Sequence, residues 1–309
     1  MVSYEILWEK LQRQNISSEL VTIFKYWYDN QINIIKWADC FSDEYKLECG
    51  VRQGGISSPT LFNVYINSLI AELSSMHAGC YIDGIAVNNL SYADDMVLLS
   101  PSISALRKML NVCEQYTMKH GLKYNTNKSE FMFFGLGGKN PTIPPIMLYG
   151  VPINRVAKFK YLGHIITDDL KDNADIERER RALAVRGNML SRRFARCSTE
   201  VKITLFKAYC QSFYTSSLWV NYTQQAYSAL RVQYNNVFRM LLRLPRFCSA
   251  STMFAGASTD DLYAIRRKRI ASLLHRLRGS SNSILKMLCN KFDSPILCFW
   301  TQIVTGALK

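Results

Sequence analysis

The chain has 309 residues, with 38 lysines and arginines against 24 acidic residues and a formal net charge of +14. Hydrophobic residues make up 48% of it, which excludes an intrinsically disordered protein and allows a sizeable buried core. No run of 18 apolar residues is present, so no segment has the composition of a membrane-spanning helix. Glu5 and Glu9 interrupt the apolar stretch that a signal peptide needs, so we expect an intracellular protein, in the nucleus, the cytoplasm or both.

The charge is divided unevenly along the chain. Residues 1–150 hold 12 basic and 14 acidic residues, whereas residues 151–309 hold 26 basic and 10 acidic residues. A strongly basic half indicates a polyanionic partner. The alternative is that these residues merely keep helical surfaces in solution.

The nine cysteines lack the paired spacing of zinc sites, so reduced, mostly buried thiols are the simplest interpretation.

Helical and strand patterns alternate over the first half of the chain, which predicts an α+β fold. Helical periodicity, with a break near residues 15–18, covers residues 4–29, 59–76 and 102–119. Strand patterns cover residues 31–49, 80–82, 85–87, 90–93, 96–99, 130–134, 147–149, 151–153 and 161–167. Beyond Thr167 only helical periodicity remains. We therefore predict a mixed domain over residues 1–166 and a basic, all-helical region over residues 167–309.

The sharpest motif is the sequence YADD at residues 92–95, between two apolar half-strands. A tight hairpin there presents Asp94 and Asp95 at its tip, where two carboxylates form a hard-oxygen site suited to Mg²⁺. In a two-metal mechanism such a site activates a 3′-hydroxyl and stabilises the leaving pyrophosphate. The alternative is an ordinary solvated turn, because aspartate favours turns.

Several motifs in order and at matching spacing resemble the reverse transcriptases of non-LTR (LINE-type) retrotransposons. They are GVRQGGISSP at residues 50–59, the helix with Phe62, Asn63 and Asn67, YADD, NKS at residues 127–129 and FKYLGHII at residues 159–166. The resemblance covers most of the chain, more weakly after about residue 170. It implies a partial right-hand polymerase palm followed by a helical thumb, and RNA-directed DNA polymerase chemistry with Mg²⁺, an RNA template, a DNA primer and a dNTP.

The resemblance also implies a role for each matching residue. Asp94 would be a metal ligand with Asp95 beside it, and Lys128 would protonate the leaving pyrophosphate. Tyr92 would line the nucleotide and primer site. The residues implied near the template and the incoming nucleotide are Arg52, Gln53, Gly54 and Gly55, and those implied in the primer grip are Tyr161, Leu162 and Gly163. Without the family match, ordinary loop chemistry would explain the glutamine and glycines, and Lys128 would be a solvated lysine.

The chain departs from the family pattern at one place. Family members carry the motif F-x-D-x-x-x-A-F-D just before the segment that resembles residues 2–11, and Met1 follows directly after that position. A two-metal site needs the bridging carboxylate of that motif. We therefore expect an N-terminally truncated polymerase that is inactive by itself. A non-catalytic RNA- or DNA-binding remnant of a retroelement is the alternative, and the protein partners stay undefined.

Basic residues of the second half are candidates for contact with the nucleic-acid backbone. The residues implied in such contacts are Arg178, Arg181, Arg192, Arg193, Arg266, Arg267, Lys268 and Arg269. The run at 266–269 also fits a nuclear-import patch, and a membrane contact is the less favoured alternative. Acidic residues between 168 and 179 are better explained by a helix N-terminus and local ion pairs than by a replacement metal site.

Overall fold

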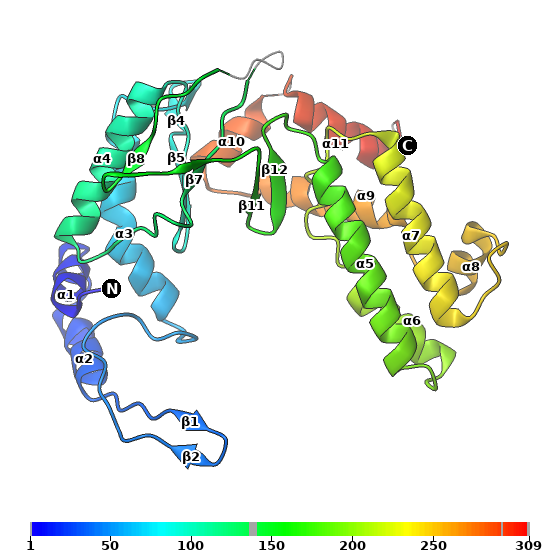
Figure 1. Cartoon of the computed structure of the whole chain (residues 1–309), viewed down its shortest axis with the longest axis horizontal. Coiled ribbons are helices and arrows are strands. Elements are labelled where there is room, and N and C mark those ends of the chain that lie inside the picture. Colours follow the sequence, from blue (N-terminus) through cyan, green and yellow to red (C-terminus); the bar gives the residue numbers. More distant parts are fainter. Residues whose placement is uncertain (1, 136–140, 292, 308–309) are drawn as a thin grey trace. The chain divides into compact units, whose positions relative to one another are not determined.

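The computed structural model describes residues 2–135, 141–291 and 293–307 (Figure 1). The chain folds into two compact units. The mixed unit comprises Met1–Glu130 and Ile143–Asn154, and the helical unit comprises Phe131–Thr142 and Arg155–Lys309. This division puts the hairpin of β11 (Lys158–Tyr161) and β12 (His164–Thr167) with the helices. The boundary near residue 167 stays a prediction.

Helices α1 (Tyr4–Arg13), α2 (Ser18–Asp29), α3 (Ser58–Ser75) and α4 (Ile103–Lys119) frame the mixed unit. Two of them begin with a serine cap, because the hydroxyls of Ser17 and Ser102 each accept the backbone N–H three residues further on. α3 follows Ser57 and starts one residue before its predicted start, with proline in its first turn. The sequence patterns therefore located α3 and α4 to within a residue or two.

An apolar stripe along α3 forms the centre of the mixed unit. Leu61, Tyr65, Leu69 and Leu73 are each at most 3% exposed. The first half of the stripe packs in one cluster with α1 and α2, and the second half packs in another with Met109 and its neighbours on α4. The width of the stripe explains why α3 is buried on several sides.

The strands form separate two-stranded sheets among the described residues. The antiparallel hairpins of the mixed unit are β1 (Lys36–Trp37) with β2 (Cys40–Phe41), β3 (Tyr81–Ile82) with β4 (Ile85–Ala86), β5 (Asn89–Tyr92) with β6 (Asp95–Leu98), and β8 (Met147–Leu148) with β9 (Val151–Pro152). Outside the hairpins, β7 (Glu130–Phe131) pairs with β10 (Asn154–Arg155). The described strands therefore do not join into one larger sheet. Strands of two to four residues pair mainly with their nearest neighbour in sequence, since a short turn makes that pairing easiest.

The helical unit is built from α5 (Asn173–Arg193), α6 (Thr199–Cys210), α7 (Gln224–Leu242), α8 (Ala250–Gly256), α9 (Leu262–Arg278), α10 (Ser283–Asn290) and α11 (Pro295–Thr305). α5 and α7 lie side by side (Figure 1). They approach closely at Gly187, where an added Cβ would lie 2.6 Å from a methyl group of Val237. Trp219, Phe206 and Tyr234 are fully buried in the aromatic core of this unit. The α+β class with a helical second half is thus confirmed in outline.

Candidate active site and nucleic-acid surface

The YADD motif forms the tip of the β5–β6 hairpin. Tyr92 pairs with Asp95 across the strands, so the two-residue turn consists of Ala93 and Asp94. This corrects the expected turn by one residue, because Asp95 already belongs to β6. Ala93 has a φ of 53°, in the left-handed region that a tight hairpin turn requires. The two carboxylates therefore come from different parts of the hairpin, one from the turn and one from a strand.

Asp94, Asp95 and Tyr92 are all exposed, and the ring of Tyr92 is 65% exposed. The next side chain, Met96, turns inward and its sulfur contacts Cys113 at 4.0 Å. Both carboxylates therefore face solvent, that of Asp94 from the turn and that of Asp95 from the start of β6. Their oxygens suit Mg²⁺, but within the described residues no cluster of three or more His, Cys, Asp or Glu side chains is arranged to hold a metal.

The base of the β5–β6 hairpin is held by Asn88, which is fully buried. Its side-chain amide donates to the carbonyl oxygens of Leu73 at 2.6 Å and Ala78 at 2.9 Å. Gly79 makes this approach possible, because a Cβ at that position would lie 2.3 Å from the Cβ of Asn88. Asn88 is a positioning residue that the sequence analysis did not identify, since an isolated asparagine carries no pattern.

Replacing Asn88 with alanine is expected to lower the free energy of unfolding by about 2–3 kcal/mol. The substitution removes the donor of the Ala78 carbonyl and one of the two donors of the Leu73 carbonyl, which also accepts the backbone N–H of Met76, and an unpaired polar group at a buried site is costly. Urea unfolding followed by circular dichroism measures the change. Asn67→Ala, at an exposed position of α3, is the matched control, and equal stability of the two variants would contradict the assigned role.

The loop that precedes α3 is held in place by a short hydrogen-bond network. The hydroxyl of Ser58 and the backbone N–H of Gly55 both donate to the carbonyl of Arg52, at 2.5 and 3.1 Å. Gly54 has a φ of 79°, which favours glycine. The side chains of Arg52 and Gln53 are exposed, so the loop presents them to solvent from a rigid backbone.

Lys128 is exposed in a turn directly before β7. The carbonyl of Asn125 accepts the backbone N–H groups of Lys128 at 3.1 Å and Ser129 at 3.0 Å, which fixes this turn.

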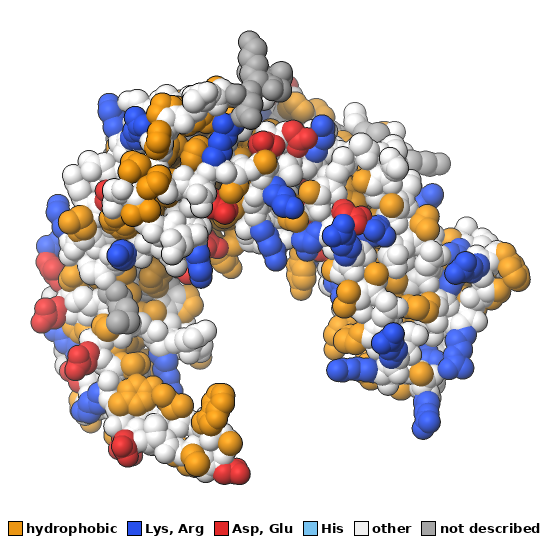
Figure 2. Space-filling view, viewed as in Figure 1, with side chains coloured by type: hydrophobic (Ala, Val, Ile, Leu, Met, Phe, Trp, Pro, Cys, Tyr) orange, Lys and Arg blue, Asp and Glu red, His pale blue; other side chains and the backbone are white. Residues whose placement is uncertain are grey.

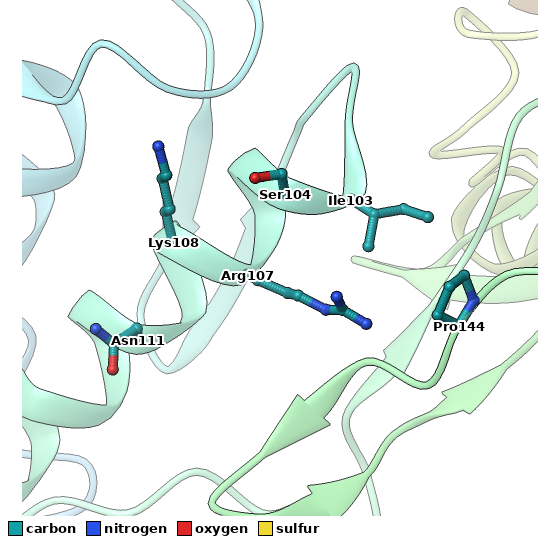
Figure 3. A pocket seen from close by; sticks show the side chains of 6 residues that line it. All are labelled: Ile103, Ser104, Arg107, Lys108, Asn111 and Pro144. Atoms are coloured by element: carbon teal, nitrogen blue, oxygen red, sulfur yellow. The ribbon is translucent and has the colours of Figure 1, made fainter.

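A shallow pocket of ≈ 450 Å³ lies between the first turns of α4 and Pro144 (Figure 3). Arg107 extends toward Pro144 and donates to the carbonyl of Pro145 at 2.9 Å. None of the predicted site residues lines this pocket.

The predicted primer-grip residues form the tip of the β11–β12 hairpin. Tyr161 pairs with His164, and Leu162 and Gly163 form the turn with φ values of 45° and 86°. Two successive positive φ values are typical of the turns that match strand twist in hairpins. Leu162 is 53% exposed although leucine rarely adopts such a φ. A strained, exposed apolar side chain at a rigid tip suits contact with a ligand.

The first acidic residues of α5 hold this hairpin onto the helical unit. Asp175 is fully buried, and its carboxylate accepts the backbone N–H of Ile165 at 3.1 Å, the hydroxyl of Thr215 at 2.7 Å and the indole N–H of Trp219 at 2.8 Å. Arg178 pairs with it at 2.8 Å. Burial alone would raise the pKa of Asp175, but these donors outweigh it and hold the pKa well below its usual range.

His164 links the same two elements. Its Nδ1 lies 3.1 Å from Asp175 and its Nε2 lies 3.6 Å from Asp172. Burial alone would lower the pKa of His164, but hydrogen bonding and attraction to the two carboxylates raise it to about 9. The sequence analysis assigned both aspartates to a helix N-terminus, where they do lie. It missed their link to His164, which depends on contacts between β12 and α5.

The arginines of α5 fall into two groups. The arginines before the last two turns pair with carboxylates. Arg178 pairs with Asp175 and Glu179, Arg180 and Arg181 pair with Glu177, and Arg186 pairs with Glu179. Arg192, Arg193 and Arg196, in and just after the last turn, are exposed and make no ion pair among the described residues. Positive charge is therefore concentrated at the C-terminal end of α5. Figure 2 shows basic side chains over the helices of this unit with few acidic ones beside them.

The basic run on α9 is divided between the core and the surface. Arg266 is 5% exposed, and its guanidinium donates to the carbonyl of Trp219 at 2.7 Å and to the hydroxyl of Tyr222 at 2.5 Å. It is a core residue, which corrects its assignment to the nucleic-acid backbone. Arg267 and Lys268 are exposed. Helical geometry explains the split, because Arg266 lies on the same face as the buried Ile270, four residues later.

Comparison with known proteins decides the family. A family model described as "Reverse transcriptase (RNA-dependent DNA polymerase)" matches residues 1–166. The chain belongs to the reverse transcriptase family. The match includes the loop at 50–59, the YADD hairpin, Lys128 and the β11–β12 hairpin up to residue 166.

Individual relatives agree with this family. The "Probable RNA-directed DNA polymerase from transposon BS" of Drosophila melanogaster is 23% identical over 278 residues, which cover 86% of this chain and 30% of the relative. The "RNA-directed DNA polymerase from mobile element jockey" of Drosophila funebris is 23% identical over 164 residues, which cover 50% of this chain and 17% of the relative. A third, "Retrovirus-related Pol polyprotein from type-2 retrotransposable element R2DM" of Drosophila melanogaster, is 32% identical over 87 residues, which cover 28% of this chain and 8% of the relative.

These matches confirm the predicted resemblance to the reverse transcriptases of non-LTR retrotransposons. The chain spans less than a third of the length of each of these relatives. It is therefore a reverse transcriptase segment. In the described residues no helix is both long and apolar enough to cross a membrane.

Proposed function

We propose that this chain supplies a metal-binding hairpin and a template–primer surface to RNA-directed DNA synthesis. The observation that supports the proposal most directly is the β5–β6 hairpin, which presents Asp94 and Asp95 to solvent on a base fixed by Asn88. In this proposal the mixed unit is palm-like and the helices from α5 onward are thumb-like. Asp94 is the better candidate for direct metal coordination, because it lies in the turn and not on a strand.

The other exposed residues have roles that follow from their chemistry. The carboxylates of Asp94 and Asp95 would hold Mg²⁺, which would supply Lewis-acid activation of a primer 3′-hydroxyl and charge stabilisation for the leaving pyrophosphate. Tyr92 offers its exposed ring to a base or sugar beside the carboxylates. Arg52, Gln53, Gly54 and Gly55 present a rigid, small-residue loop to the template and nucleotide, and Lys128 carries a proton for the leaving group. The tip of the β11–β12 hairpin, where Leu162 and Gly163 are exposed and Tyr161 is half-buried, contacts the primer end.

The template–primer surface centres on the C-terminal end of α5. Arg192, Arg193 and Arg196 form no ion pair within the part of the chain that the structure describes, and the exposed Arg267 and Lys268 of α9 add positive charge. Arg178 and Arg181 already pair with carboxylates, so they contribute less net charge to a polyanion. Lysine and arginine contacts to phosphates release counterions, and the resulting affinity falls steeply with salt.

Removing the three arginines at the end of α5 together, as Arg192→Gln, Arg193→Gln and Arg196→Gln, is expected to weaken binding of an RNA–DNA hybrid about 10- to 50-fold at moderate salt. The slope of log affinity against log salt should become shallower by about 2–3, because three phosphate contacts are lost. Filter binding across a salt series measures both quantities. A triple variant at exposed lysines of the mixed unit, Lys46→Gln, Lys119→Gln and Lys123→Gln, is the control. An unchanged slope in the arginine variant would contradict the assigned surface.

Primer extension tests the catalytic half of the proposal. We expect this chain by itself to bind an RNA template with a DNA primer but to add no nucleotides with Mg²⁺ or Mn²⁺. The reason is that a two-metal site needs a carboxylate that bridges both ions, and Asp94 and Asp95 are neighbours on one hairpin. DNA synthesis by the chain that disappears in Asp94→Ala would overturn this expectation. It would show that the hairpin acts as a complete metal site.

A further inference from the structure

A second concave site lies within the helical unit, between the end of α6, the segment that follows it and α9. It has a volume of ≈ 430 Å³, and the residues that define it here, the Tyr214 pocket, are Lys207, Gln211, Tyr214, Lys268, Arg269 and Arg276. Four of these six side chains are basic. Three of these basic residues lie on α9, and the fold brings Lys207 of α6 to them.

Most of the positive charge in the Tyr214 pocket is not neutralised. Lys268 forms an ion pair with Asp260 at 2.6 Å. Lys207, Arg269 and Arg276 donate only to backbone carbonyls among the described residues, at 3.1, 3.5 and 3.4 Å. Three uncompensated cations that converge on one recess favour an anion with several negative oxygens, such as a phosphate group.

The pocket also offers an aromatic face. Tyr214 is 78% exposed, which is unusual for so large a ring next to a well-packed core. The guanidinium of Arg269 lies 5.6 Å from the centre of this ring, so the ring and the guanidinium form one stacking platform. Exposed aromatic rings beside cations are typical of sites that stack unpaired bases, whereas the bases of a duplex are already stacked on one another.

We propose that the Tyr214 pocket binds one unpaired nucleotide of a single-stranded segment, separately from the duplex surface at the end of α5. The base stacks on Tyr214 and Arg269, and the adjoining phosphates lie against Lys207 and Arg276. The proposal rests on the proposed function, because it assumes that the helical unit holds nucleic acid. A single-stranded template beyond the base-paired region has the required chemistry, and DNA and RNA strands share it.

Fluorescence anisotropy with labelled dT12, rU12 and a blunt RNA–DNA hybrid tests this proposal on the full chain. Tyr214→Ala is expected to weaken binding of the single strands about 5- to 20-fold, and to change binding of the hybrid less than twofold. Tyr214→Phe should keep single-strand affinity, because it retains the stacking ring. Arg276→Gln should make the single-strand salt slope shallower by about 0.7. The controls are Tyr26→Ala and Lys119→Gln, at exposed positions of the mixed unit.

The other outcomes overturn the proposal in distinguishable ways. If Tyr214→Ala binds single strands as the wild type does while hybrid binding is normal, the pocket has no such role and the proposed function stands. An equal loss on single strands and hybrid would assign Tyr214 to the duplex surface instead. Stronger competition by polyglutamate than by unlabelled dT12 would assign the pocket to an acidic protein partner. If the wild-type chain binds none of the three probes, the proposed function fails as well.

Discussion

Replacing Asp175 with alanine is expected to lower the free energy of unfolding of the helical unit by about 3–5 kcal/mol. The carboxylate is fully buried and accepts hydrogen bonds from Thr215, Trp219 and the backbone of β12. Its removal leaves these donors unpaired and leaves Arg178 without its closest carboxylate. Urea unfolding followed by circular dichroism measures the loss.

Asp169→Ala is the control for this experiment. Asp169 is a nearby aspartate that pairs with Lys171 at 3.0 Å, but both side chains are about half exposed, so the pair is screened by water. The control should therefore unfold at nearly the wild-type urea concentration. A similar small effect in Asp175→Ala would show that the buried carboxylate does not hold β12 to α5.

The stability of the chain is expected to fall as the pH rises through about 9, partly because of His164. The pKa of this side chain is raised to about 9 in the folded state, compared with about 6.5 in an unfolded chain. The folded state thus binds the proton more tightly, and the stabilisation is complete below pH 6.5 and is lost as the pH passes 9. A pKa difference of this size between the folded and unfolded states corresponds to about 3 kcal/mol of unfolding free energy.

His164→Gln should remove this part of the pH dependence. The change in unfolding free energy between pH 6.5 and 9.5 should be smaller in the variant than in the wild type, because thiols and tyrosines titrate equally in both. His120→Gln is the control. Burial lowers the pKa of His120, so protonation of this side chain changes the unfolding free energy only at acidic pH. If His164→Gln loses as much stability on alkalisation as the wild type, the ion pair with Asp172 and Asp175 is not formed in solution.

Local sequence patterns were sufficient to predict the β5–β6 hairpin, except for the position of its turn. The alternation of apolar residues identified both strands, and the aspartates indicated a turn between them. The turn lies one residue earlier than expected, at Ala93 and Asp94, because the inward packing of Met96 against Cys113 decides which residues pair. Alanine at a positive φ has no sequence signature.

Charge patterns were less informative than strand patterns, because basic residues that are alike in sequence have different environments. Arg266 and Arg267 are adjacent, but one is buried against Tyr222 and the other is exposed. The long side chain of an arginine can satisfy buried carbonyls as well as bind phosphates. The number of basic residues therefore overstated the charge available to a nucleic acid.

The sequence by itself determined the family, the order of the helices and hairpins, and the exposed residues of the β5–β6 hairpin, because these depend on short motifs and local periodicity. Only the tertiary structure decided that Arg266 is buried, that β12 is held by Asp175, and that Tyr214 lies among cations from two helices. The reason is physical: the side chains that bind Asp175 from Thr215 and Trp219, and the partners of Arg266, lie 40 to 47 positions away in the chain, and their proximity results from packing of the core.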